Sequence, residues 1–147
     1  MYNYQRAEVN RAFLLVVDSF DHYEVPAPYR AVIIESFLLG LAGKWNIYNM
    51  DGCTCVPDLW PNKFTPSCTP HDGFWKMGMG GYMIDRVFTE INKSYKLPKS
   101  KVRRRFIGVR IGWLFAYKWK HLFNGNVSKP TETLIKAYEY YKLSKQK

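Results

Sequence analysis

The sequence has no apolar run long enough to cross a bilayer. A transmembrane helix needs about 20 consecutive apolar residues, and the longest candidate, residues 31–43, is shorter and is interrupted by Glu35. The N-terminal part carries Glu8 ahead of a short apolar run at 13–17, and no convincing small-residue cleavage site follows. This pattern is a poor match to a secretory signal. We therefore expect neither a membrane-spanning helix nor a signal peptide.

Cysteines are few, and they are not dispersed along the chain. All three, Cys53, Cys55 and Cys68, fall within 16 residues, which excludes the spread disulfide framework of a small secreted scaffold. One disulfide with a free thiol, a metal site and three reduced thiols all stay open. The chain also lacks internal repeats and low-complexity tracts. Its 147 residues, with 47% hydrophobic and 17% aromatic content, indicate one folded domain spanning residues 1–147.

Acidic residues are scarce in the C-terminal part of the chain. Residues 92–147 contain 15 Lys/Arg and only 2 Glu, a net charge of +13, whereas residues 1–91 contain 7 Lys/Arg and 10 Asp/Glu, a net charge of −3. A basic segment of this kind favours polyanionic partners such as anionic lipid head groups, nucleic acid or an acidic protein, although a solvated basic face gives the same composition. The segment has no specific nucleic-acid recognition motif.

The spacing of apolar residues predicts an all-α fold. Apolar positions recur at intervals of three and four residues, and strand-like alternation is weak throughout. Thr65 and Pro66 form a good helix start, with Thr at the cap and Pro at the first helical position. Residues 44–64 have no sustained period and are expected to form a structured loop. The expected helices cover residues 3–18, 27–42, 66–77, 82–94, 99–123 and 130–144.

The first two expected helices are amphipathic. Phe13, Leu14 and Val17 form one apolar stripe. The second stripe consists of Val32, Ile33, Phe37, Leu38 and Leu41. We expect both stripes to face the core.

The central part of the chain contains a His-Asp pair and a second Asp on the following expected helix. A short Gly-rich turn at 78–81 separates His71 and Asp72 from Asp85. Such a turn would make the two helices pack antiparallel, with His71 and Asp85 at comparable heights. A carboxylate that faces a histidine holds its tautomer and stabilises the imidazolium formed when the histidine removes a proton. Asp72 would point to another side of its helix and could bind a hard cation.

The loop ahead of this helix pair suits a cation. Residues 51–58 read Asp-Gly-Cys-Thr-Cys-Val-Pro-Asp and can turn several backbone carbonyls toward one point. Calcium takes such oxygen ligands at about 2.3–2.6 Å. A disulfide between Cys55 and Cys68 could tie this loop to the helix that bears His71. Because the closed loop is short, the disulfide would act by positioning as much as by stabilising.

Ordered motifs in this region resemble the phospholipase A2 superfamily. DGCTC at 51–55, SCTPHD at 67–72 and IDRVF at 84–88 are similar to the Gly-Cys-x-Cys calcium loop, the Cys-x-x-His-Asp helix and the Asp-Arg-containing second helix of the secreted enzymes. With the Gly-Val-Arg run at 108–110, the pattern looks still more like the small phospholipase A2-like proteins of bacteria and their phages. The resemblance covers residues 51–113. It implies a phospholipase A2-like antiparallel helix hairpin preceded by a metal-binding loop, here with extra N- and C-terminal helices.

The resemblance implies a calcium-dependent esterase that hydrolyses the sn-2 ester of phospholipids. His71 would be the general base that activates water, and Asp85 would orient His71. Calcium would polarise the ester carbonyl, with the backbone N–H of Val56 as a second oxyanion donor. The implied calcium ligands are Asp72 and the backbone carbonyls of Thr54, Val56 and Asp58.

The chain departs from the secreted enzymes at three of these positions. Val56 and Asp58 stand where those enzymes have glycines. Trp75 stands where they have a tyrosine whose hydroxyl supports the orienting Asp. An indole N–H can also donate, but from a different position.

A structural zinc site is the first alternative. Cys53, Cys55, Cys68 and His71 have the C-x-C…C-x-x-H spacing of a closed site with three thiolates and one imidazole. Such a site would remove His71 from catalysis and would give Asp85 no role.

The second alternative is a non-catalytic structural or adaptor component of a phage virion that keeps this fold and binds other virion proteins. The basic, aromatic helix expected at 99–123 could bind a phospholipid membrane surface or another polyanion, because Lys and Arg beside Trp and Tyr suit a membrane interface. Ordinary core packing would also explain its aromatic residues. The residues predicted for this surface are Arg103, Arg104, Arg105, Trp113, Lys118, Trp119 and Lys120. The esterase and the adaptor hypotheses both place the protein in a virion or at the host envelope.

Overall fold

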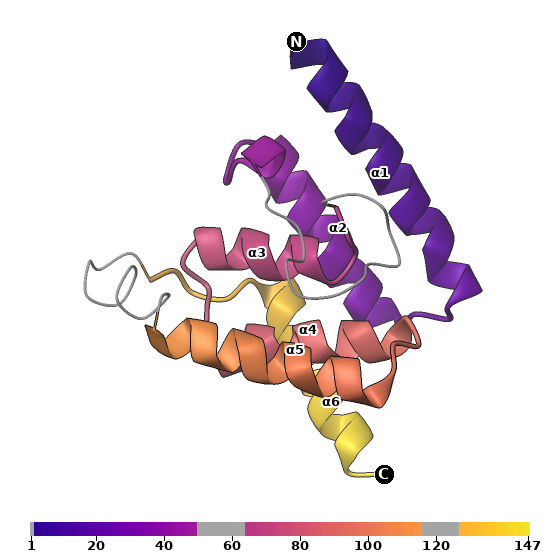
Figure 1. The fold of residues 1–147 in the computed structure, drawn as a ribbon, viewed down its shortest axis with the longest axis vertical. Coiled ribbons are helices and arrows are strands. Elements are labelled where there is room, and N and C mark those ends of the chain that lie inside the picture. The colour runs from indigo at the N-terminus through magenta and orange to yellow at the C-terminus, as the bar shows by residue number, and fades with distance from the viewer. Residues whose placement is uncertain (1, 50–63, 116–126) are drawn as a thin grey trace.

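The computed structural model describes residues 2–49, 64–115 and 127–147, and this part of the chain is all-helical (Figure 1). The elements are α1 (Tyr2–His22), α2 (Ala27–Leu41), the short 3-10 helix η1 (Ile47–Asn49), α3 (Cys68–Lys76), α4 (Tyr82–Ser94), α5 (Lys99–Gly112) and α6 (Glu132–Lys145). The predicted all-α class is therefore confirmed for the described ranges, which have helices near both ends of the chain. No helix within these ranges is both long enough and apolar enough to cross a membrane.

The helix boundaries follow local chemistry. α2 and α5 each begin directly after a proline, Pro26 and Pro98, whose backbone is extended (φ −58°, ψ 143° and φ −55°, ψ 142°). Proline has no N–H to satisfy and restricts the residue before it, so it marks a helix start well. α4 has the predicted bounds, and α3 starts two residues later than predicted. The predicted end of the fifth helix, at 123, lies outside the described residues.

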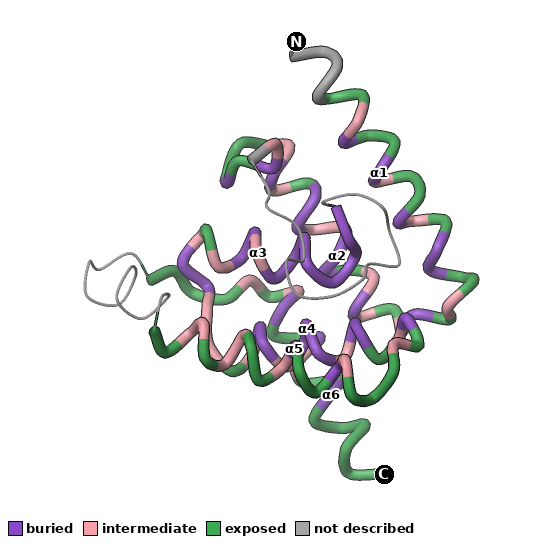
Figure 2. Tube along the Cα trace, in the orientation of Figure 1, coloured by how far each residue is buried: buried purple, intermediate pink, exposed green. Residues whose placement is uncertain are grey.

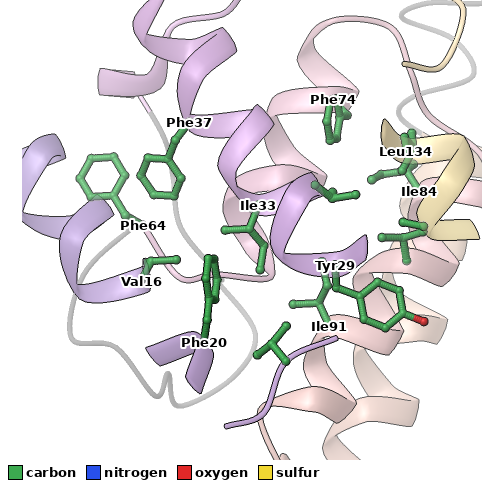
Figure 3. Packing of buried hydrophobic residues seen from close by; sticks show 14 of the residues in the cluster. Val16, Phe20, Tyr29, Ile33, Phe37, Phe64, Phe74, Ile84, Ile91 and Leu134 are labelled. Carbon is green, nitrogen blue, oxygen red and sulfur yellow. The ribbon is translucent and has the colours of Figure 1, made fainter. Parts of the chain in front are cut away.

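One hydrophobic cluster joins α1, α2, α3, α4 and α6. Figure 3 shows Val16 and Phe20 of α1, Ile33 and Phe37 of α2, and Phe74, Ile91 and Leu134 in this core. The buried positions of α1 recur at three- and four-residue intervals, as a helix packed along one face requires; they are Val9, Ala12, Val16 and Phe20. The predicted stripes were therefore only partly right.

Leu14 and Leu38 correct those stripes. Their side chains are 61% and 54% exposed, whereas Phe13 and Val17 are partly buried against the core. Each exposed leucine follows a core-facing residue directly. On a helix with 3.6 residues per turn, the next residue points about 100° away, so an apolar neighbour does not have to share the buried face.

A tryptophan fixes how α3 lies against α2. Trp45 is buried, and its Nε1 donates to the backbone carbonyl of Ser36 at 3.2 Å. A Cβ placed on Gly73 would lie only 2.6 Å from the Trp45 ring, so a side chain at this position would clash. The glycine lets α3 approach the indole closely, and this contact positions the helix that carries His71.

Candidate active site

His71 and Asp85 are in contact, and both are buried. Nε2 of His71 lies 2.8 Å from Oδ1 of Asp85, so the contact predicted from the sequence is present. The histidine is 8% exposed and the aspartate is completely buried. α3 supplies the imidazole and α4 supplies the carboxylate, and the two helices are connected through Gly78 and Gly81, which have positive φ values of 86° and 120°. These backbone conformations suit glycine and allow the sharp reversal between the helices.

Two aromatic rings pack against the imidazole. The ring of His71 lies 4.5 Å from that of Trp75 and 4.8 Å from that of Phe88, centroid to centroid. Trp75 in turn lies against α5, because a Cβ placed on Gly112 would be 3.3 Å from its ring. This packing restricts rotation of the histidine side chain, so the imidazole is held by contacts as well as by its hydrogen bond.

Arg110 completes the surroundings of Asp85. Its Nη1 donates to Oδ2 of Asp85 at 2.9 Å, so both carboxylate oxygens have partners. The Arg110 guanidinium also lies over the rings of Tyr82 and Trp113, at 5.4 and 5.2 Å from their centroids. A fully buried carboxylate is costly unless it is paired and hydrogen-bonded, and Arg110 supplies the paired charge.

No role was predicted for Arg110 from the sequence, although it belongs to the Gly-Val-Arg run of the resemblance. It lies 25 residues from Asp85, and its contact depends on how α5 packs on α4. The signal that could have indicated a role for Arg110 was the presence of a basic residue in a motif otherwise made of small and apolar residues.

The second nitrogen of the imidazole is left available. Among the described residues, the hydrogen bond recorded for the His71 side chain is the one from Nε2 to Asp85, and 11% of the side chain stays exposed. An ionised carboxylate only accepts hydrogen bonds, so the chemistry assigns the proton to Nε2 and a lone pair to Nδ1. A neutral imidazole in this tautomer can accept a proton at Nδ1.

Asp72 points away from this pair. Its Oδ2 is 3.6 Å from Nζ of Lys76, one turn along α3. The same oxygen is buried and has no hydrogen-bond partner among the described residues. An ionic contact at this distance leaves the lone pairs of a carboxylate oxygen free, and a hard cation would use them.

The predicted metal-binding loop lies outside the described residues, including Thr54, Val56 and Asp58. The same holds for Cys53 and Cys55. Cys68 is disulfide-bonded, and its partner lies outside these residues as well. Among the described side chains, no three His, Cys, Asp or Glu groups gather closely enough to hold a metal ion. The calcium and zinc predictions both depend on the segment that is not described.

The predicted basic surface is present only in part. Arg103 and Arg104 are exposed, and Trp113 is half-buried. Arg105 was predicted wrongly, because it is only 6% exposed and its Nη1 donates to Oδ1 of Asn92 at 2.6 Å. Three consecutive residues of a helix span most of its circumference, so one of the three arginines must face α4. Lys118, Trp119 and Lys120 lie outside the described residues.

Exposed apolar side chains form a stripe on α5 and its C-terminal continuation. The exposed fractions are 47% for Ile107, 50% for Ile111, 48% for Leu114 and 74% for Phe115. Ile107, Ile111 and Leu114 are spaced by four and three residues and therefore lie on one side of the helix, and the exposed Phe115 follows Leu114 directly. Figure 2 shows exposed positions recurring along α5. We call these four residues the α5 stripe. Contiguous exposed apolar surface of this kind is typical of an interaction site.

Comparisons with protein-family profiles, with curated proteins and with solved structures find no significant match for this chain.

Proposed function

We propose that this protein is a calcium-dependent phospholipase A2-like esterase that hydrolyses the sn-2 ester of phospholipids. The observation that supports this most is the buried hydrogen bond between Nε2 of His71 and Oδ1 of Asp85. The motifs around both residues resemble those of phospholipases A2, and the geometry is the one that a general base needs. Nδ1, the second nitrogen of His71, has no hydrogen-bond partner among the described residues, as a general base requires before it takes a proton.

In the proposed reaction, Nδ1 of His71 accepts a proton from a water molecule as the water oxygen attacks the carbonyl carbon of the ester. The carbonyl π electrons move to the oxygen, and the imidazole becomes positively charged. Asp85 stabilises this imidazolium through Nε2. Collapse of the tetrahedral intermediate breaks the bond to the glycerol oxygen. That oxygen takes the proton back from Nδ1, which releases a fatty acid and a lysophospholipid.

Asp72 fits the calcium site that the proposal requires. Its buried Oδ2 has no hydrogen-bond partner among the described residues, and the backbone carbonyls of Thr54, Val56 and Asp58 would supply further ligands. When bound, calcium would polarise the ester carbonyl and stabilise negative charge on its oxygen. We favour calcium over zinc because Cys68 is disulfide-bonded and therefore offers no thiolate.

The α5 stripe would bring the enzyme to its substrate. Apolar side chains at the stripe can enter the interfacial region of a bilayer, and the exposed Arg103 and Arg104 on the same helix can attract anionic head groups. We propose a phospholipid membrane surface as the partner and the envelope of a phage host as the place of action. The same stripe supports the second candidate function, a non-catalytic adaptor that binds other virion proteins.

Release of fatty acid from phosphatidylglycerol vesicles tests the enzyme proposal. We expect release in the presence of calcium, none with a chelator, and a loss of at least about a hundredfold in His71→Asn, since general bases contribute about 10²–10⁴-fold. His22→Asn is the matched control, because His22 is an exposed residue at the end of α1. Calcium-independent release, or equal loss in both variants, would overturn the proposal. No release by the wild-type protein, together with stable binding to a virion component, would establish the adaptor.

A further inference from the structure

We infer that a groove between α4 and α5 binds a single alkyl chain with an anionic head group, in a site separate from His71. The groove has a volume of about 570 Å³, within the range of about 300–1,000 Å³ that is usual for small-molecule sites. Its walls combine positive charges with apolar side chains.

Four cationic side chains line the groove. They are Arg86 and Lys93 of α4 and Lys99 and Arg103 of α5. Glu90 pairs with Nη2 of Arg86 at 3.2 Å and with Nζ of Lys93 at 3.1 Å, so one carboxylate balances one of these two charges. Lys99 and Arg103 have no carboxylate partner among the described residues. The groove therefore carries excess positive charge that an anion would neutralise.

The N-terminus of α5 lies beside the groove. Lys99 is the first residue of this helix, and Leu97 just before it also lines the groove. The residue before the helix is Pro98, whose side chain cannot cap this terminus, and the first turn contains no acidic residue. The first N–H groups of a helix have no partner within the helix and carry partial positive charge, so they favour an anion. With Lys99 and Arg103 beside them, they form a binding site for a phosphate or carboxylate group.

The rest of the groove suits an alkyl chain. Its apolar lining comes from Leu97, Val102 and Phe106, and Val102 is only 5% exposed. The guanidinium of Arg86 already lies over the Phe106 ring, 5.2 Å from its centroid, so this face of the ring is taken. A nucleobase would require a free ring face for stacking, whereas an alkyl chain requires only apolar contact. The combination therefore favours an anionic amphiphile over a nucleotide.

The groove and the histidine site lie on adjoining faces of α4. Arg86, Thr89 and Lys93 face the groove, whereas Asp85 faces His71. Thr89 of the groove lies beside the second site, since its Oγ1 donates to the backbone carbonyl of Asp85 at 2.9 Å. Binding in the groove needs neither the histidine nor calcium, so this inference does not depend on the proposed hydrolase activity.

Calorimetric titration of the full chain with decyl phosphate and with decanoate tests the inference. Both probes are used below their critical micelle concentrations and with chelator present. Inorganic phosphate supplies the head group alone, and decyl maltoside supplies the chain alone. We expect binding of at least one charged probe and at least about tenfold weaker binding of phosphate and decyl maltoside, since neither makes both sets of contacts. Which charged probe binds more tightly tells whether an alkyl phosphate or a fatty acid is the better ligand.

A pair of double variants assigns the binding to the groove. K99Q/R103Q removes the two unpaired cations of the groove, and K101Q/R104Q removes two charges from the same helix outside it. We expect at least about tenfold weaker binding in the first variant and less than about twofold change in the second, because only the first loses charge-assisted contacts. Equal weakening in both variants, or no binding of either charged probe to the wild-type protein, would overturn the inference.

Discussion

Replacing Arg110 by methionine tests how the buried carboxylate of Asp85 is held. The substitution keeps most of the apolar length of the side chain and removes the guanidinium that donates to Oδ2 of Asp85 at 2.9 Å. Oδ2 would then lie in a completely buried position without its charged donor. We expect the free energy of unfolding to fall, because the folded state would contain an incompletely paired buried charge.

The size of the effect follows from the burial of the two partners. Breaking a fully buried ion pair costs about 3–5 kcal/mol, and leaving a buried polar group unsatisfied costs about 1–3 kcal/mol. The Arg110 side chain is 30% exposed, which reduces the value of the pair, so we expect a loss of about 2–3 kcal/mol. In an Asp85→Asn background the same substitution removes no ion pair and should cost about 1 kcal/mol or less.

Urea unfolding of the wild type, both single variants and the double variant measures this coupling. Arg104→Met is the matched control, since Arg104 is an exposed cation on the same helix, and we expect a change within about 0.5 kcal/mol. If the losses from Arg110→Met and Asp85→Asn simply add to within about 0.5 kcal/mol, Arg110 does not stabilise the carboxylate.

Three further predictions concern packing, pH and the disulfide. Gly73→Ala would press a Cβ into Trp45 and should lower the free energy of unfolding in urea by about 1–3 kcal/mol. Gly108→Ala is the control, because the new Cβ has open space around it, and it should be neutral or stabilising by up to about 1 kcal/mol. Equal effects of the two substitutions would contradict the packing of Gly73 against Trp45. Burial raises the pKa of Tyr95 to about 12 from 10.0. Above pH 10 the unfolded chain therefore loses this proton first, so stability should fall between about pH 10 and 12, and thermal melts of Tyr95→Phe should show a smaller fall; the same fall in both would be evidence against this. Cys68→Ser should lower stability by about 2–4 kcal/mol, and an equal loss when the wild type is reduced would show that the disulfide causes it.

Local patterns in the sequence were sufficient for the helices and for the main contact of the site. The Gly-rich turn at 78–81 and the spacing of His71 and Asp85 predicted two adjacent helices with these side chains in contact, and the structure has that contact. Both signals act over short separations, where turn chemistry and helix periodicity decide the geometry.

Features that depend on how distant helices pack could not be predicted from the same patterns. Arg105 faces Asn92 and Arg110 faces Asp85, but nothing in the local sequence tells which side of α5 meets α4. The exposed Leu14 shows the same limit on α1, where the position of the buried face depends on its packing partner. The groove between α4 and α5 arises from this packing too, so it had no signal in the sequence beyond its positive charge.

The most direct test of the account is the position at which the enzyme cleaves a phospholipid that carries different acyl chains at sn-1 and sn-2. Mass spectrometry of the products, with calcium present, would be compared between the wild type and His71→Asn. We predict that the wild type releases the sn-2 chain alone and that the variant releases at least about a hundredfold less. Release of both chains at equal rates, or unchanged release by His71→Asn, would contradict the role of the His71–Asp85 pair as the base that activates water.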